Sequence, residues 1–212
     1  MRHRLALMFM PLTLLAAMSV TVPVQARQVT VIQPLTVSAT QGLKITGMDV
    51  TFGETFRKEQ EESDAKAACK RAAAGLPALD PASYPSGPQP PEAYDTLPFK
   101  QMFPLVMRDV TKDWGLDHGR PVTLRITLER LKTADAAIAI LLAPSADVLD
   151  GTVQVLDTAT AAPLGSFRVS VVNVQGGWAQ MLMRGWGVRE KLAKEFGLEL
   201  SRHLSGRSKK PA

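Results

Sequence analysis

The residues that could carry catalysis or metal binding are few and stand far apart in the sequence. His118 and His203 are the two histidines downstream of the N-terminal segment, and they belong to unrelated parts of the chain. Since a metal site needs several ligands held together, we interpret both as surface or capping histidines. No serine stands in a G-x-S-x-G motif, and no glycine-rich run matches a phosphate-binding loop. The sequence therefore predicts no catalytic residue, no cofactor and no metal.

Two aspartates have the spacing closest to that of a cation loop. Asp147 and Asp150 flank two apolar residues before Gly151, but the further oxygen ligands that calcium requires are missing. We predict a turn here and no calcium site. An enzyme remains the competing hypothesis, a hydrolase with a sparse carboxylate site, because acids distant in the sequence can meet in the fold.

The strongest candidates for an interaction surface are apolar. Residues 134–144 form an apolar run too short to span a bilayer, and two tryptophans follow on a glycine-rich stretch. A buried strand or core corner is the favoured interpretation of the run, and an apolar lip that contacts lipid or a partner is the alternative. The tryptophans either fill space in the hydrophobic core or contact a partner at an interface. The possible interface residues are Ile138, Ile140, Leu141, Leu142, Trp178 and Trp186.

The N-terminal segment has the three parts of a secretory signal peptide. Two arginines precede an apolar run from Leu5 to Val22, and the small residues Val24 and Ala26 stand at −3 and −1 of a cleavage site. We therefore predict a signal peptide at residues 1–26, cleavage after Ala26, and a periplasmic or secreted location. An uncleaved membrane anchor is the alternative, because the run approaches the roughly 20 apolar residues that span a bilayer.

Charge and cysteine content narrow the class of protein. Loss of Arg2 and Arg4 with the signal lowers the formal charge from +5 to +3, and aromatic residues make up 6% of the chain. A nucleic-acid-binding surface would need a basic stripe with exposed aromatics, so we expect no nucleic acid. The single cysteine, Cys69, cannot form a disulfide within the chain, and its alanine-rich surroundings favour a small buried residue.

Five segments have the composition or the alternation of β-strands. They are rich in Val, Ile, Thr and Leu, and in most of them apolar residues alternate with polar ones. The loop between the last two contains a proline and a glycine, which predicts a hairpin. The five segments are Val29–Val37, Leu43–Phe52, Pro121–Glu129, Gly151–Asp157 and Ser166–Val174.

Three segments have helical character. Thr55–Ala74 is rich in helix formers with a thin alanine stripe, which predicts a surface helix, whereas the apolar spacing of Phe99–Trp114 predicts the main core helix. In that helix Pro104 marks either a start near Phe103 or a kink. The last helix runs to Leu204, with its regular part from about Val188. Strands and helices in this order predict an α+β fold, a mostly antiparallel sheet with helices packed on one face.

The predicted organisation is a single domain at residues 27–206 that follows the signal peptide. Six prolines fall within residues 76–91, which predicts a long loop or linker inside that domain. Residues 207–212, with Arg207, Lys209 and Lys210, predict a flexible basic tail.

The C-terminal part of the chain resembles a group of bacterial proteins. The pattern runs from Val122 to Leu204 and includes the strand Gly151–Asp157, a turn through Thr160, and the closing amphipathic helix. In these features it is similar to the C-terminal half of uncharacterised bacterial cell-envelope proteins and lipoproteins. The resemblance implies a small α/β domain, a role in the envelope and no established enzyme activity. This chain departs from the pattern in lacking a lipobox cysteine, in its proline-rich insertion, and in having Ala161 where a turn glycine is expected.

These observations favour a non-catalytic exported cell-envelope protein, an accessory, assembly or binding component. Its partner would be an envelope protein or the membrane surface. A lipid or glycolipid carrier is a further hypothesis, for which an apolar cavity between sheet and helices is required.

Overall fold

The order of elements follows the predicted series of strands and helices. The computed structural model describes residues 25–36, 42–77, 96–133, 145–175 and 187–209. In this part of the chain the elements are β1 (Gln25–Gln33), β2 (Leu43–Phe52), α1 (Glu54–Ala73), α3 (Phe99–Thr111), the short 3-10 helix η2 (Lys112–Trp114), β3 (Arg120–Lys132), β4 (Ser145–Asp157), β5 (Pro163–Gln175) and α6 (Val188–Ser205).

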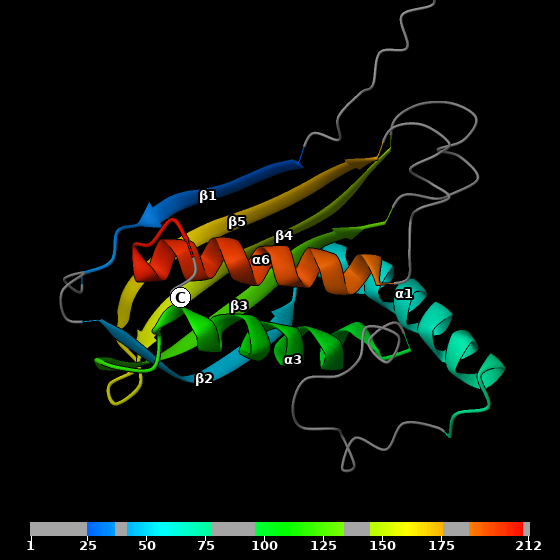
Figure 1. Ribbon diagram of the computed structural model, residues 1–212, viewed down its shortest axis with the longest axis horizontal. Helices are drawn as coiled ribbons and strands as arrows, with labels where there is room; N and C mark the ends of the chain where they lie inside the picture. The colour runs from blue at the N-terminus through cyan, green and yellow to red at the C-terminus, as the bar shows by residue number, and fades with distance from the viewer. Residues whose placement is uncertain (1–24, 37–41, 78–95, 134–144, 176–186, 210–212) are drawn as a thin grey trace, which may run out of the picture.

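The strands form one five-stranded sheet in the order β1-β5-β4-β3-β2 (Figure 1). β3, β4 and β5 pair antiparallel in succession, and β1 joins the free side of β5 antiparallel. β2 pairs with β3 in parallel, because α1 and α3 separate these strands in the chain and return it to the same end of the sheet. The predicted fold class, α+β with a mostly antiparallel sheet and helices on one face, is confirmed.

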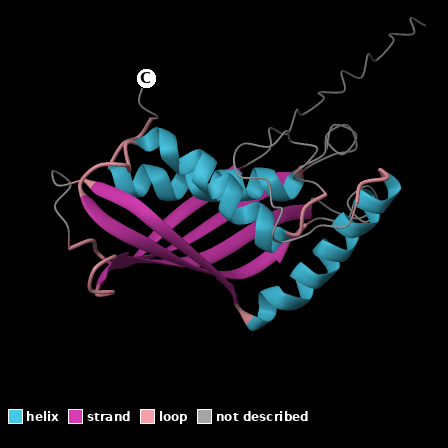
Figure 2. Cartoon of the chain, turned by 90° about the horizontal axis from the view of Figure 1, so that it is seen from below, coloured by secondary structure: helices cyan, strands magenta, loops and turns pink. Residues whose placement is uncertain are grey.

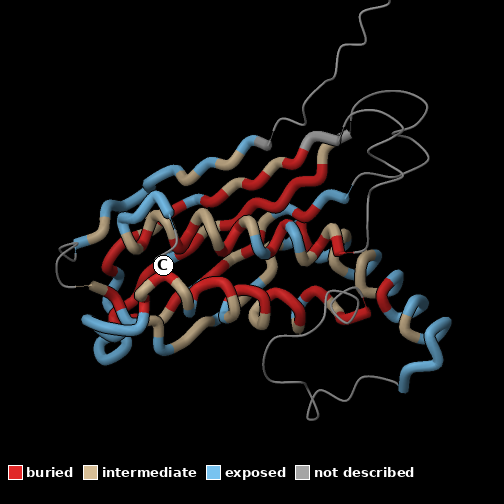
Figure 3. The backbone as a smooth tube through the Cα atoms, viewed as in Figure 1, coloured by how far each residue is buried: buried red, intermediate tan, exposed pale blue. Residues whose placement is uncertain are grey.

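Alternation along the strands gives the sheet two unlike faces. In β3 the residues Val122, Leu124, Ile126 and Leu128 are fully buried, while the residues between them are partly or largely exposed. Helices α3 and α6 lie across the buried face, and no described helix lies over the other (Figure 2). The buried residues therefore concentrate in the layer between the sheet and these two helices (Figure 3).

A chain of phenylalanine rings ties the layers together. Phe56 of α1 stacks on Phe52 of β2 with ring centroids 5.0 Å apart, and contacts Phe99 at 5.4 Å. Phe99 and Phe103 stack within α3 at 5.7 Å, and Phe103 meets Phe196 of α6 edge-on at 5.5 Å. Aromatic pairs at these distances add about 0.5–1.5 kcal/mol each beyond the area they bury, so this chain fixes α1, α3 and α6 against one another.

Helix α1 is the surface helix that its composition predicts. Its two buried residues are Phe56 and Ala67, and it extends beyond the end of the sheet (Figure 1). Cys69 is exposed, so the expectation of a buried cysteine is wrong. It stands two residues after Ala67, about 200° further round a helix of 3.6 residues per turn, and therefore on the side away from the core.

Helix α3 begins earlier than one of the two predicted alternatives allows. Its first residue is Phe99, and Pro104 lies inside it, so a start near Phe103 is wrong. At the other end α3 is followed by η2, and Gly115 ends this segment in the left-handed conformation with φ 66°.

The β4–β5 turn is held by one carboxylate. Asp157 Oδ1 accepts hydrogen bonds from the backbone N–H groups of Ala159 and Thr160 and from the Thr160 hydroxyl. Ala161 has φ 57°, so the position where the sequence pattern expects a turn glycine does adopt a left-handed conformation. The predicted hairpin is confirmed, and its side-chain hydrogen bonds offset the strain of an alanine in that region.

Candidate functional site

The apolar interface candidates from the sequence lie outside the described residues. These are Ile138, Ile140, Leu141, Leu142, Trp178 and Trp186, which fall in 134–144 and 176–186. The proline-rich loop also lies largely outside, since residues 78–95 are not described. No helix in the described ranges is long and apolar enough to cross a membrane.

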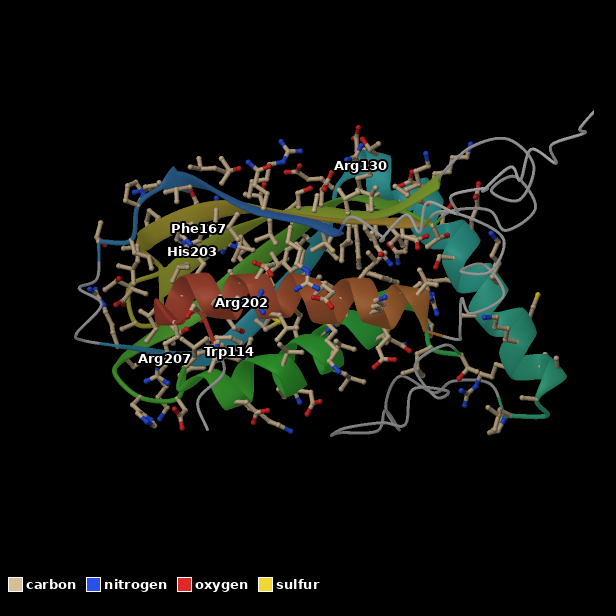
Figure 4. All side chains as sticks on the ribbon, turned by 45° about the horizontal axis from the view of Figure 1, so that its top comes forward. Trp114, Arg130, Phe167, Arg202, His203 and Arg207 are labelled. Atoms are coloured by element: carbon tan, nitrogen blue, oxygen red, sulfur yellow. The ribbon has the colours of Figure 1, made fainter. Side chains whose placement is uncertain are left out.

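The two histidines have separate and unrelated surroundings. His118 is largely exposed and pairs with the neighbouring Asp117 at 2.8 Å. His203, near the C-terminal end of α6, packs edge-on against Phe167 of β5 with ring centroids 4.4 Å apart, and Figure 4 labels the two residues next to each other. Burial lowers the pKa of His203. Within the ranges the structure describes, no group of three His, Cys, Asp or Glu residues could hold a metal ion.

Asp147 and Asp150 lie in β4 and form no turn, so that prediction is wrong. Both are buried, Asp147 at 0% and Asp150 at 4% relative exposure. The strand begins at Ser145, before them, and continues because the pairing with β5 extends past Asp150 to Ser145. Successive strand residues point to opposite faces, so Asp147 belongs with the helix-covered side and Asp150 with the open side.

Three rows of polar side chains, thirteen residues in all, cross the open face of the sheet, and we call these residues together with Glu129 the polar face. Each row follows the register of neighbouring strands. The middle row is Thr51, Thr127, Thr152, Arg168 and Thr30. The rows on its two sides are Asp49, Arg125, Gln154 and Ser166, and Arg130, Asp150, Ser170 and Gln28. At about 4.8 Å between strands the middle row spans about 19 Å.

A β-bulge in β3 brings two charged neighbours onto this face. The register with β4 shifts between Leu128 and Arg130, so Glu129 and Arg130 both lie on the open side. Arg130 Nη2 stands 2.6 Å from Asp150 Oδ2, and the Ser170 hydroxyl donates to Asp150 Oδ1 at 2.6 Å. A bulge often changes the direction of side chains in this way, and Arg130–Asp150 is the first of two ion pairs at this bulge.

The second ion pair joins the middle row to the bulge. Arg168 Nη2 lies 3.0 Å from Glu129 Oε2, and the Thr152 hydroxyl donates to Glu129 Oε1 at 2.6 Å. Further along, the hydroxyls of Thr51 and Thr127 lie 3.1 Å apart. The open face therefore carries three groups of charge-assisted and neutral hydrogen bonds, which together involve four strands.

The positive partner in each of these pairs is the more exposed one. The Arg130 side chain is 52% exposed and that of Asp150 only 6%, while Arg168 is 53% exposed and Glu129 37%. Arg125, in the next row, is also exposed. The guanidinium groups are therefore the outermost charged groups of this face, and the more buried carboxylates orient them. A guanidinium presented in this way can bind a carboxylate or phosphate through two parallel hydrogen bonds.

One acid at the end of the sheet has a strongly shifted pKa. The Arg120 guanidinium donates to Asp157 Oδ2 at 2.8 Å, and together with the turn hydrogen bonds from Thr160 and Ala159 it lowers the pKa of Asp157 to about 2. An acid held ionised in this way cannot donate a proton near neutral pH. The hydrogen bonds of Asp157 therefore indicate that it stabilises the β4–β5 turn.

Two further polar clusters anchor the helices. Arg27 of β1 lies 2.8 Å from Glu195 and 3.6 Å from Glu199 of α6. Arg189, almost fully buried at the start of α6, donates to the Leu97 carbonyl at 2.7 Å and to the Ser63 hydroxyl of α1 at 2.9 Å. Both clusters join elements of the fold to one another, which is a structural role.

Comparison with known proteins identifies no family. No family model matches the sequence, and no curated protein matches it. Among solved structures the chain is similar to the PelC dodecamer from Paraburkholderia phytofirmans, with 11% identity and a TM-score of 0.37 over 87% of this chain and 100% of that one. A leucine-to-methionine variant of that dodecamer gives 11% identity and a TM-score of 0.34, over 88% and 100% of the two chains. TM-scores this low are no basis for a functional assignment.

Proposed function

We propose that this chain is a non-catalytic, exported cell-envelope protein that binds an acidic polysaccharide through the polar face. The observation that carries the proposal is the exposure of Arg125, Arg130 and Arg168 above more buried acids on a sheet face that no described helix covers. This arrangement offers fixed cationic groups among rows of hydroxyl and amide side chains.

The chemistry of the face matches that of a carboxylated sugar chain. Guanidinium groups bind carboxylates in a bidentate geometry, while threonine and serine hydroxyls and the Gln154 amide both donate and accept hydrogen bonds to sugar hydroxyls. Arg125 and Arg168 stand two strands and two residues apart in the register, which places their Cα atoms about 12 Å from each other. A polymer with repeated carboxylates can engage both at once, which multiplies weak single contacts.

Export rests on the N-terminal sequence and is consistent with the position of β1. Cleavage after Ala26 makes Arg27 the first residue and leaves most of β1, with its pairing to β5, in the mature chain. The ion pairs of Arg27 with Glu195 and Glu199 would be retained. N-terminal sequencing of protein from fractionated cells tests this part: Arg27 as the first residue in the soluble envelope fraction supports it, and full-length protein in the cytoplasm contradicts it.

The binding experiment uses protein purified after expression of the full chain, with polygalacturonate and neutral dextran as probes. We expect the protein to bind polygalacturonate and not dextran, with an affinity that falls as salt is raised from 50 to 300 mM. The double variant Arg125→Gln, Arg168→Gln should lose at least tenfold in affinity. These two arginines are chosen because Arg130 pairs with the buried Asp150, so its removal would also affect stability.

The matched control is the double variant Arg57→Gln, Arg108→Gln, which removes two exposed arginines on α1 and α3 and should bind as well as the unmodified protein. Equal losses in the control and in Arg125→Gln, Arg168→Gln would mean that binding follows net charge and would contradict a site on the polar face. Release of new reducing ends from polygalacturonate during the incubation would contradict a non-catalytic role.

A further inference from the structure

Strand β1 is an edge of the sheet with little protection against pairing. Among the described strands it pairs only with β5, so one row of its backbone N–H and C=O groups lies outside the ladder. From Gln28 to Gln33 it contains no charge, no proline and no glycine. Edge strands in monomeric proteins usually carry such features, because an open edge accepts another strand.

The opposite edge has the protection that β1 lacks. β2 carries Lys44 and Asp49, and an isolated antiparallel bridge joins Lys44 to Asp117. Charges on an edge strand hinder the addition of another strand. Both edge strands have a register shift, β2 between Ile45 and Gly47 and β1 between Val31 and Gln33, so the two edges differ in charge, and β1 is the less protected of the two.

Exposed apolar side chains gather on the same strand. The described part of the chain exposes three large apolar side chains, and two are neighbours on β1: Val31 at 46% and Ile32 at 59%. Val31 pairs in register with the fully buried Phe167, and Val29 with the fully buried Val169. Both valines therefore extend the buried, helix-covered row of the sheet to its rim, where they are left partly uncovered.

The strand is complementary to itself when a second copy runs antiparallel to it. With Thr30 opposite its own symmetry mate, Val29 meets Val31 of the other copy and Val31 meets Val29, so four valines form one cross-strand cluster. Arg27 then faces the segment Ile32 to Gln33, where the register of β1 with β5 shifts, and no like charges face each other. This pairing is that of a two-fold symmetric dimer, the commonest oligomer of soluble proteins.

We propose that β1 is a dimerisation edge, on which β1 of a second copy docks antiparallel to make one continuous ten-stranded sheet. A two-fold axis perpendicular to the sheet keeps like faces on the same side, so the α6 helices of both copies share one side. The two polar faces then lie together on the other, and an acidic polymer could bridge them. That last consequence rests on the proposed function, and the dimer itself does not.

A cysteine at the predicted axis tests the register. In a Cys69→Ser background, which removes the exposed native thiol, Thr30→Cys should form a disulfide-linked dimer under oxidising conditions. Facing residues of antiparallel strands have Cα atoms about 4.5–5.5 Å apart, within the range of a disulfide. The matched control is Asp49→Cys in the same background, an exposed residue of β2, which should not cross-link.

Sedimentation of the protein without added cysteines measures the association itself. We expect a monomer–dimer equilibrium that shifts with concentration, and Val31→Lys should make the protein monomeric at every concentration. Because Val31 is half exposed, its melting temperature should change little when measured at a concentration where the unmodified protein is monomeric.

Three results would overturn the proposal. The first is a protein that sediments as a monomer at every concentration. The second is a Thr30→Cys variant that does not cross-link while sedimentation shows dimers. The third is cross-linking through Asp49→Cys, which would mean that β2 pairs with β2 of a second copy. Polygalacturonate binding by monomeric Val31→Lys separates this proposal from the proposed function, because a single copy keeps its own polar face.

Discussion

The two faces of the same sheet are stabilised in different ways. On the helix-covered face the strands contribute Val, Leu, Ile and Phe side chains that are fully buried. On the polar face the alternate residues of those strands form hydrogen bonds and ion pairs in contact with solvent. One strand such as β3 therefore contributes to the core through Ile126 and to the polar face through Thr127.

The residues of the helix-covered face stabilise the fold, whereas most residues of the polar face remain available for binding. Burial of an apolar side chain stabilises the fold by about 1.5–3 kcal/mol, whereas exposed ion pairs contribute about 0–1 kcal/mol. Substitutions on the helix-covered face should therefore act on stability. Those on the polar face should act mainly on binding, with the buried Asp150 as the exception.

The largest effect on stability is expected in the aromatic chain. Phe103 is fully buried between Phe99 and Phe196, and Phe103→Ala should destabilise the protein by about 3–5 kcal/mol. Urea denaturation followed by far-ultraviolet circular dichroism measures it. A loss below about 1 kcal/mol would show that this layer is not the core on which the comparison depends.

A smaller loss is expected at Asp150, the buried acid of the polar face. Asp150→Ala removes the acceptor for both Arg130 and Ser170, and we expect a loss of about 1–3 kcal/mol in the same assay. The control is Gln154→Ala, an exposed residue on the same strand and face, which should stay within about 0.5 kcal/mol of the parent. Equal losses at both positions would remove the distinction between Asp150 and its surroundings.

The turn acid Asp157 should make stability depend on pH. Its pKa in the folded protein is about 2, below the ordinary value of 3.8, chiefly because of Arg120. A lowered carboxyl pKa stabilises the fold above the unfolded value, and that contribution disappears as pH falls from about 4 to about 2. The stability difference between the parent and Asp157→Asn should therefore shrink over that interval. A difference that stays constant from pH 6 to pH 2 would contradict this account of the turn.

The smallest effect on stability is expected for the arginines proposed to bind. The variant Arg125→Gln, Arg168→Gln should unfold within about 1 kcal/mol of the parent, because both side chains are exposed and Glu129 is itself 37% exposed. Circular dichroism melts on the protein used for binding measure this. A loss of several kcal/mol would mean that the arginines stabilise the fold and that a binding defect could be indirect.

Much of the fold could be predicted from periodicity alone. The alternation in Pro121–Glu129 predicts a strand with one solvent-exposed face, and the structure confirms this strand as β3. The helical spacing from Phe99 to Trp114 likewise predicts the core helix. Both patterns are local, and each follows from which side of an element meets the core.

The polar face could be predicted only in part, because it depends on contacts between strands. That Thr123, Arg125 and Thr127 share a solvent side follows from alternation. That Glu129 and Arg130 both join that side does not, since the bulge is set by the pairing of β3 with β4. The sequence predicts a turn at Asp150 because two aspartates before a glycine are typical of turns, whereas its partner Arg130 is supplied by another strand.

The most direct test of the central claim is to observe the arginine side chains during binding. Nuclear magnetic resonance of the Nε–Hε groups resolves individual arginines, so polygalacturonate can be titrated into labelled protein with dextran as the control. We predict that the signals of Arg125, Arg130 and Arg168 shift together with one affinity, while those of Arg57 and Arg108, exposed on α1 and α3, do not move. Shifts of Arg57 and Arg108 with the polar-face signals unchanged would contradict the claim that the open face of the sheet is the binding surface.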